Sequence, residues 1–311
     1  MICGPAKKNN LIGTTQTNKY YTEDESWIHN DEFAITKIVK KINPGSIVLD
    51  VGCAQGKMGK YLKNEKNCTM YGIELDKVAI GYAKKTKAYE RIDQYNIEKL
   101  EDDTKLTKEI KEIIAKVDYV VFADVLEHLV DPTAVVRAVM NCLKPEAKIL
   151  ISIPNLGHID TIFDLMNGKF NYDDCGILDN THLRFFTKHS FAEWIDQMNE
   201  QTTDYKIDCK LLDQTYTFPD YEAEGKEYQK VVEAVCKDTQ LYVLQNIFSL
   251  EKTKNQPTEL KKLLQETTPD VVERLNEKLK EIEVLDQALR DIHNSKGYRL
   301  LNKLYRLKGK K

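Results

Sequence analysis

An acid followed by a glycine-spaced turn is the first sign of chemistry in the sequence. Asp50 ends an apolar run, and Gly52 and Gly56 follow it. Glycine lets the backbone turn sharply and leaves no side chain between its amides and a ligand. The dinucleotide fingerprint needs glycines where this chain has Ala54 and Lys57, so a pyrophosphate ligand fits poorly. A carboxylate beside the turn favours a cationic ligand instead, because opposite charges attract strongly where water is scarce.

A second acid lies where it could bind a nucleoside. Residues 70–75 form an apolar strand pattern that holds Glu74, 22 residues after Gly52. In doubly wound folds, an acid about 20 residues after the glycine turn binds the ribose hydroxyls. S-adenosylmethionine carries a ribose, an ammonium and a sulfonium, so it matches both Glu74 and Asp50. The two acids together predict this cofactor.

The elements that must position these acids alternate between strand and helix as far as Asn155. This alternation predicts an α/β fold, with a doubly wound, mostly parallel sheet and helices on both faces. Ligands bind such sheets beyond the carboxyl ends of the strands. Four polar side chains are expected on that rim, namely Asp50, Glu74, Asn96 and Asp124. Residues 205–212 and 241–250 are expected to complete the sheet as antiparallel strands, with a helix over 221–235 between them.

Four motifs resemble those of class I S-adenosylmethionine-dependent methyltransferases, and they occur in the family's order. They lie at residues 50–56 (DVGCAQG), 72–74 (GIE), 124–132 (DVLEHLVDP) and 143–155, where LKP precedes ILISIPN. The resemblance covers residues 47–155 and implies a seven-stranded Rossmann-like sheet, here followed by a C-terminal helical extension. The cofactor-binding residues that it implies are Asp50, Gly52, Cys53, Ala54, Gly56, Glu74, Leu75, Asn96, Ile97 and Asp124.

Within this set, the resemblance implies that Asp50 and the turn backbone hold the methionine end, and that Glu74 binds the ribose. Leu75 and Ile97 would contact the faces of adenine, and Asn96 its amino edge. Asn96 departs from the family, in which an acid is commoner, although its amide oxygen can accept the same hydrogen bond. An ordinary strand-end residue beside a core residue would explain Asn96 and Ile97 equally well.

A second resemblance concerns the acceptor. Residues 179–187, DNTHLRFFT, resemble a signature of methyltransferases associated with sugar and surface-glycan biosynthesis. It implies that His182 faces the acceptor, and His128, after the fourth expected strand, is a second candidate base. Methyl transfer to a hydroxyl requires alignment and removal of a proton, for which histidine is suited. The other expected substrate contacts are Arg184, Tyr20 and Tyr21.

The polar residues after the fourth expected strand also suggest a metal site. Side chains three and four apart share a helix face, and carboxylates and imidazoles are metal ligands. The candidate ligands for Mg²⁺ are Asp124, Glu127, His128 and His182. Small-RNA terminal 2′-O-methyltransferases and some ubiquinone-pathway O-methyltransferases use a similar Glu-x-x-Glu-His motif, in which this chain has Asp124 for the first glutamate. A salt bridge or a helix cap is the alternative role for Glu127.

Composition divides the chain into three parts. We expect an N-terminal cap over residues 1–29, a methyltransferase domain over 30–250 with a lid at 156–190, and a linker and tail over 251–311. Apolar residues recur at three- and four-residue steps between 275 and 292, which predicts an amphipathic helix. Its apolar face could self-associate or bind a glycan-assembly partner, and the basic residues 298–311 could contact an anionic membrane.

Overall composition limits the classes of partner and the compartment. The formal net charge is −3, so no general basic field recruits nucleic acid. The sequence has no apolar run of about 18 residues or more, and residues 1–10 lack the apolar core of a secretory signal. We therefore expect a cytoplasmic protein, with peripheral contact at the inner face of the membrane through the tail. The seven cysteines include no Cys-x-x-Cys pair, which favours reduced thiols.

Three functions are compatible with these patterns. The leading hypothesis is O-methylation of a sugar hydroxyl in a cell-surface glycan or its precursor. The alternative enzyme would methylate a small phenolic or quinone-like acceptor, for which the same fold and histidines would serve. An alternative of another class is a non-catalytic scaffold that binds S-adenosylmethionine and recruits glycan-assembly enzymes. The presence of Asp50, Glu74 and His182 together argues against the scaffold.

Overall fold

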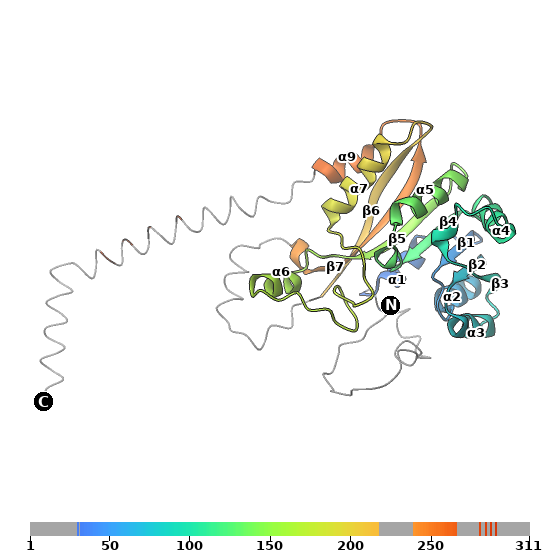
Figure 1. Cartoon of the computed structure of the whole chain (residues 1–311), viewed down its shortest axis with the longest axis horizontal. Coiled ribbons are helices and arrows are strands. Elements are labelled where there is room, and N and C mark those ends of the chain that lie inside the picture. Colours follow the sequence, from blue (N-terminus) through green and yellow to red (C-terminus); the bar gives the residue numbers. More distant parts are fainter. Residues whose placement is uncertain are drawn as a thin grey trace, which may run out of the picture. The chain divides into compact units, whose positions relative to one another are not determined.

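The computed structural model describes residues 30, 32–217 and 239–265, together with positions 280, 284, 287 and 290 (Figure 1). The chain divides into two compact units, one formed by residues 1–219 and 240–266 and the other by 220–239 and 267–311. The expected cap over 1–29, with Tyr20 and Tyr21, lies outside the described residues. The expected helix over 221–235 also lies outside them, as do residues 266–311 of the expected linker and tail apart from those four helical positions. The sheet and the polar sites lie in the first unit.

A seven-stranded sheet forms the centre of this unit, in the order β3-β2-β1-β4-β5-β7-β6. Its strands are β1 (Ile47–Val51), β2 (Thr69–Glu74), β3 (Tyr89–Gln94), β4 (Tyr119–Ala123), β5 (Lys148–Pro154), β6 (Lys206–Tyr216) and β7 (Val243–Thr253). The first five strands pair in parallel, whereas β7 pairs antiparallel with both β5 and β6. The prediction of a doubly wound, mostly parallel sheet completed by two antiparallel strands is confirmed.

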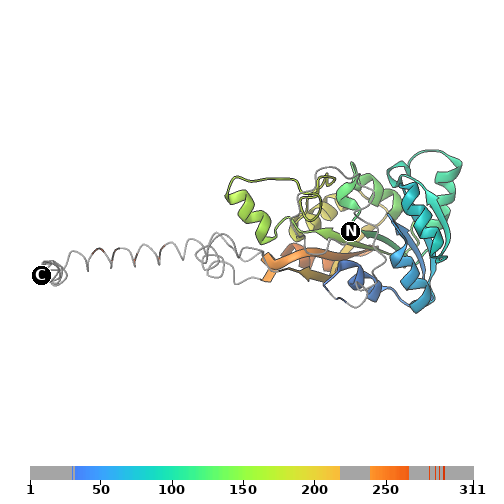
Figure 2. The same cartoon turned by 90° about the horizontal axis from the view of Figure 1, so that it is seen from below.

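Helices cover both faces of the sheet, as Figures 1 and 2 show. They are α1 (Ala34–Lys41), α2 (Lys57–Lys66), α3 (Lys77–Lys85), α4 (Lys105–Ile114), α5 (Pro132–Cys142), α6 (Ile159–Met166), α7 (Lys188–Glu200) and α9 (Thr258–Gln265). The described part of the chain also contains three short 3-10 helices, η3 (Ile97–Lys99) before α4, η4 (Leu126–His128) before α5 and η6 (Thr239–Tyr242) before β7. One apolar core contains side chains of α4, α5, α7 and α9, and the other contains side chains of α1 and α2.

Side chains that accept backbone hydrogen bonds fix where several helices begin. Asp76 accepts from the amide of Val78 at the start of α3, and Asp131 accepts from the amide of Ala134 at the start of α5. Thr187 begins α7 with a reciprocal capping box to Ser190. Such caps satisfy amides that the first helical turn leaves without intrahelical partners. They also set where the preceding loops end, and those loops carry the polar side chains described below.

The first unit continues beyond residue 250, where the sequence composition predicts the start of a linker. Strand β7 runs to Thr253, and α9 then packs on α7 and β6 through the buried side chains of Leu260 and Leu263. The Asp208 carboxylate accepts from the Leu260 amide at 2.9 Å and so caps this helix. None of the helices in the described part of the chain combines the length and hydrophobicity that a membrane-spanning segment needs.

Candidate active site

The glycine-spaced turn between β1 and α2 has the sharp geometry that its sequence predicts. Gly52, Ala54 and Gly56 have φ angles of 72°, 46° and 77°. The amides of Gly52 and Cys53 donate to the Ile73 carbonyl at 2.8 and 3.1 Å, so the turn is fastened to β2. A Cβ atom on residue 52 would lie 2.8 Å from Cγ2 of Val125. Both φ and space therefore require glycine at this position.

Glu74, at the end of β2, is held against the turn by backbone amides. One carboxylate oxygen accepts from the Ala54 amide at 2.9 Å, and the other accepts from Leu75 and Asp76 at 2.7 and 3.0 Å. The adjacent Leu75 side chain is 59% exposed. This arrangement brings an ionisable acid, an exposed apolar side chain and the glycine turn together at one rim of the sheet.

Two further residues expected at the cofactor lie at η3. The Asn96 side-chain oxygen accepts from the Glu98 amide at 3.0 Å and caps this short helix. Ile97 is buried and belongs to the larger apolar core. Asn96 and Ile97 thus already have structural roles, and any contact of either with adenine stays a prediction.

Asp50 is buried beneath the turn, and a tyrosine that the sequence did not single out holds it. The carboxylate is 3% exposed and accepts from the Tyr89 hydroxyl at 2.7 Å. Burial raises the pKa of Asp50 to about 7; the Tyr89 hydrogen bond lowers it and the negative charge of Glu74 raises it. Burial also raises the pKa of the Tyr89 hydroxyl, so this group stays a donor at neutral pH. Asp50 therefore lies close to the midpoint of its titration near neutrality.

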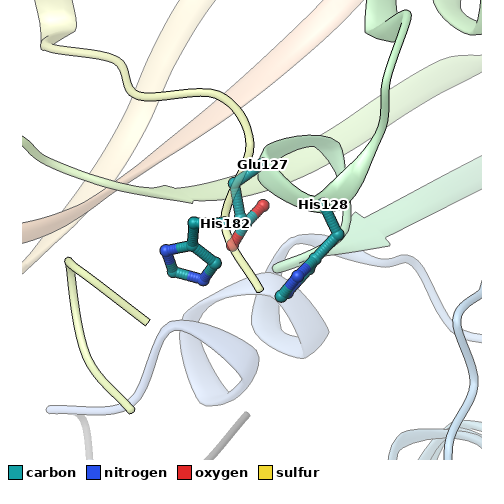
Figure 3. Close-up of side chains that lie close together, drawn as sticks. All are labelled: Glu127, His128 and His182. Atoms are coloured by element: carbon teal, nitrogen blue, oxygen red, sulfur yellow. The ribbon is translucent and has the colours of Figure 1, made fainter. Parts of the chain in front are cut away.

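A second polar cluster, formed by Glu127, His128 and His182, lies beyond the end of β4 (Figure 3). The ligand atoms of these three side chains lie within 4.8 Å of one another, and the two imidazole rings contact each other edge to face with their centroids 4.8 Å apart. Glu127 and His128 belong to η4, whereas His182 comes from the loop before α7. The Glu127 carbonyl joins these segments by accepting from the amides of Leu183 and Arg184 at 2.7 and 3.0 Å.

The Glu127 carboxylate is buried, and no described residue donates a hydrogen bond to it. Glu127 is 1% exposed, and neither of its carboxylate oxygens has a hydrogen-bond partner among them. Burial, followed by the charge of Asp124, raises the pKa of Glu127 well above its ordinary value. A buried polar group that lacks partners is costly. The cluster is therefore suited to a proton, a cation or a polar ligand group.

Backbone carbonyls fix the orientation of both imidazole rings. Nδ1 of His182 lies 2.9 Å from the Ile177 carbonyl oxygen, and Nδ1 of His128 lies 3.3 Å from the Thr181 carbonyl oxygen. A carbonyl oxygen only accepts, so each Nδ1 is the donor and each Nε2 of a neutral ring keeps its lone pair. Burial and the proximity of His182 lower the pKa of His128, which favours its neutral form. The buried Nε2 of His128 has no partner among the described residues.

A threonine and an aspartate of the same loop support His128. The Thr181 hydroxyl lies 3.1 Å from Nδ1 of His128 and donates to Asp179 at 2.6 Å. Asp179 is buried and also accepts from the Thr181 amide. Both residues lie in the nine-residue segment that the sequence singles out, although their supporting roles could not be read from it.

Asp124, the fourth predicted metal ligand, has other partners. Its carboxylate accepts from Ser152 and from Gln245, each at 2.7 Å. The structure therefore brings together three of the four predicted ligands. Arg184 is exposed, and its guanidinium donates to the Val130 carbonyl, so its expected contact with substrate stays a prediction.

Together, the sheet order, the turn after β1 and the acid after β2 define a class I S-adenosylmethionine-dependent methyltransferase fold. Residues 30–202 match the model of the family described as "Methyltransferase domain". The chain belongs to this family and is an S-adenosylmethionine-dependent methyltransferase.

Solved structures of methyltransferases are similar to the chain at low identity. The plantazolicin methyltransferase BamL, in complex with a triazolic desmethylPZN analogue and SAH, is 16% identical over 71% of this chain and 82% of its own, with a TM-score of 0.44. A SAM-dependent methyltransferase from Archaeoglobus fulgidus is 15% identical over 74% of this chain and 100% of its own, with a TM-score of 0.45. No curated protein matches the sequence.

Proposed function

We propose that this methyltransferase transfers its methyl group to a hydroxyl, and that the acceptor is a sugar hydroxyl of a cell-surface glycan or its precursor. The observation that carries the proposal is the buried cluster of Glu127, His128 and His182, which offers imidazole lone pairs for a proton. The resemblance of residues 179–187 to enzymes of sugar and surface-glycan biosynthesis supports the choice of acceptor.

The residues of the chain divide between two tasks in this reaction. Asp50, Glu74 and the turn backbone bind the cofactor in this proposal, with Asp50 pairing with its cationic end and Glu74 with its ribose. Nε2 of His182 accepts the proton of the acceptor hydroxyl while the oxygen attacks the methyl carbon in line with the departing sulfur. The hydrogen bond from Nδ1 of His182 to the Ile177 carbonyl strengthens as the ring becomes positive, and so stabilises that charge.

A divalent cation is the second candidate for how the cluster acts, and the unpartnered oxygens of Glu127 favour it. The donor set of one carboxylate and two imidazoles fits Mg²⁺, Mn²⁺ or a related ion, although imidazole suits transition metals better than magnesium. Glu127, His128 and His182 would hold the ion. When bound, it would polarise the acceptor hydroxyl and lower the pKa of that group.

Transfer of labelled methyl from S-adenosylmethionine into an extract of source cells that lack the enzyme tests the acceptor. The extract is fractionated into lipid-linked saccharide, RNA and small molecules. Label in the saccharide fraction is the expected result. Label in the small-molecule fraction would assign a phenolic or quinone-like acceptor instead, and label in RNA would also overturn the proposal. Absence of label despite binding of S-adenosylhomocysteine would favour the scaffold.

Variants of the cluster separate catalysis from cofactor binding. His182→Ala should retain S-adenosylmethionine binding and lose turnover, whereas His189→Ala on α7 is the matched control and should retain both. Normal turnover by His182→Ala would refute the role assigned to this histidine.

Metal removal decides between the base and the cation. If the cluster acts through a cation, titration of metal-free protein with Mn²⁺, followed by electron paramagnetic resonance, will show a site that Glu127→Gln removes and Glu193→Gln on α7 retains. Methyl transfer that is unaffected by EDTA, in protein checked to be free of metal, would exclude the cation and leave His182 as the base. Loss of transfer that Mn²⁺ or Mg²⁺ restores would establish the cation.

A further inference from the structure

Three aromatic rings gather at the surface beside the polar cluster. They belong to Phe170, Tyr172 and Phe185, and their centroids lie 5.6, 6.1 and 6.5 Å apart in pairs. Phe170 and Tyr172 are 45% and 54% exposed, although large aromatic side chains usually bury much of their surface. Packing against the described core therefore leaves much of these two rings in contact with solvent.

The three aromatic rings extend outward from the two imidazole rings of the polar cluster. The ring centroid of Phe185 lies 6.4 Å from that of His182, which lies 4.8 Å from that of His128. This continuity joins an exposed aromatic surface to the groups that we assign to proton transfer. A ligand that contacts Phe185 would therefore lie beside the imidazole ring of His182.

Backbone hydrogen bonds hold the segments that carry these rings. The amide of Asp173 donates to the Leu178 carbonyl, and the amide of Asn180 donates to the Asp173 carbonyl, each at 2.8 Å, which closes the loop after Tyr172. The amide of Leu156, just after β5, donates to the carbonyl of Phe186, the neighbour of Phe185. Backbone hydrogen bonds therefore hold the chain next to both Tyr172 and Phe185.

Exposed polar side chains border the rings. Asn171 and Asp173 flank Tyr172 in the sequence, and both are exposed. The faces of aromatic rings are negative, so they attract the weakly positive C–H groups of a saturated ring. Carboxylates and amides accept hydrogen bonds from hydroxyls. A pyranose ring offers both C–H faces and hydroxyl donors, whereas a simple phenol would use the aromatic faces and leave most of the polar border unpaired.

We propose that Phe170, Tyr172 and Phe185 form the acceptor subsite and pack against a saccharide ring whose hydroxyl reaches His182. This inference rests on the proposed function, because it supplies the binding surface for the same acceptor. The row of rings orients the saccharide, and the polar residues beside Tyr172 pair with hydroxyls that do not react.

Saturation-transfer NMR on the full chain with bound S-adenosylhomocysteine tests the subsite without requiring methyl transfer. The probes are methyl α-D-mannopyranoside, methyl β-D-galactopyranoside and methyl α-L-rhamnopyranoside, with 4-methylphenol as the aromatic competitor. We expect saturation of ring C–H protons in at least one pyranoside. Tyr172→Leu and Phe170→Leu should each weaken that binding by about 2- to 10-fold, the range that one aromatic contact supplies.

Tyr82→Leu is the matched control, because Tyr82 is an exposed tyrosine on α3 outside this group. It should leave pyranoside binding unchanged, and all three variants should bind S-adenosylhomocysteine as the natural sequence does, which verifies folding. Binding of 4-methylphenol alone, binding of no pyranoside, or pyranoside binding that Tyr172→Leu and Phe170→Leu leave intact would each overturn the subsite.

The extract experiment separates failure of the subsite from failure of the proposed function. Label in the saccharide fraction with an unchanged KM for that acceptor in both aromatic variants would retain the function and reject the subsite. Pyranoside binding that depends on Tyr172, without label in saccharide, would retain the subsite as a sugar-binding surface and reject the assigned acceptor.

Discussion

Binding of S-adenosylmethionine should depend on pH through a single buried carboxyl group, Asp50. Its pKa is about 7 because burial raises it, and the cationic cofactor should bind the ionised form. With that pKa, about one-tenth of Asp50 is ionised at pH 6 and about three-quarters at pH 7.5, so affinity should rise about 8-fold between them. The range stops at 7.5 because the α-amino group of the cofactor itself titrates at about 8.

Tyr89→Phe sharpens this test, because it removes the hydroxyl that donates to Asp50 and lowers its pKa. A hydrogen bond to a charged group contributes about 1.5–3 kcal/mol, which corresponds to about 1–2 pH units. The midpoint of the binding profile should therefore move upward by that amount. At pH 7.5 the variant should bind about 3- to 30-fold more weakly than the natural sequence.

Isothermal titration calorimetry with S-adenosylmethionine at several pH values between 6 and 7.5 provides the profile. Tyr119→Phe is the control, since it removes a hydroxyl from the neighbouring strand β4 and should leave the midpoint unchanged. Affinity that does not vary over this range, or a Tyr89→Phe profile that coincides with the natural one, would falsify the role of the Asp50 charge.

Four further predictions concern stability and the cofactor. The pKa of Asp50 in the folded protein is about 7, above its ordinary value of 3.8. The free energy of unfolding of the ligand-free protein should therefore fall as pH rises from 3.8 to about 7, and Asp50→Asn should remove this dependence in urea unfolding. Glu74→Gln should weaken cofactor binding by about 10- to 100-fold, measured by calorimetry, because a charged hydrogen-bond acceptor is lost; unchanged affinity would contradict its assigned contact with ribose. Gly52→Ala should lower the thermal midpoint, since residue 52 has φ of 72° and a Cβ atom would lie 2.8 Å from Val125. Phe191→Ala should lower the free energy of unfolding, measured in urea, by about 3–5 kcal/mol, because the buried Phe191 ring stacks on that of Phe248 with the ring centroids 4.3 Å apart. A loss below about 1 kcal/mol would show that the core collapses around the gap.

The sheet and its glycine turn were predictable because their signals are local. Apolar runs end in acids at β1 and β2, and the glycines at 52 and 56 mark a turn that few other residues could form. The end of the unit was harder to predict. From the sequence alone, α9 falls within the predicted linker. Leu260 and Leu263 show that α9 belongs to the core only through their contacts with α7 and β6, which are distant in the sequence.

The polar sites depended on contacts between residues far apart in the sequence. Nothing near Asp50 in the sequence indicates that Tyr89 would donate to it, and nothing near Asp124 indicates Gln245 as its partner. Composition and spacing could therefore nominate the acids and histidines. They could not tell that Asp124 has Ser152 and Gln245 as partners, while Glu127 has no hydrogen-bond partner for its carboxylate among the described residues.

The backbone carbonyl of Glu127 accepts hydrogen bonds from the amides of Leu183 and Arg184, and this contact limits how the active site can be redesigned. Main-chain atoms form them, so most side-chain substitutions leave them in place, whereas an insertion or deletion in either loop would shift the register between them. A chimera that takes the loop after β4 from one enzyme and the loop before α7 from another would misplace His182 even if every catalytic side chain were kept. The two loops should therefore be exchanged as one cassette when acceptor specificity is transplanted onto this scaffold.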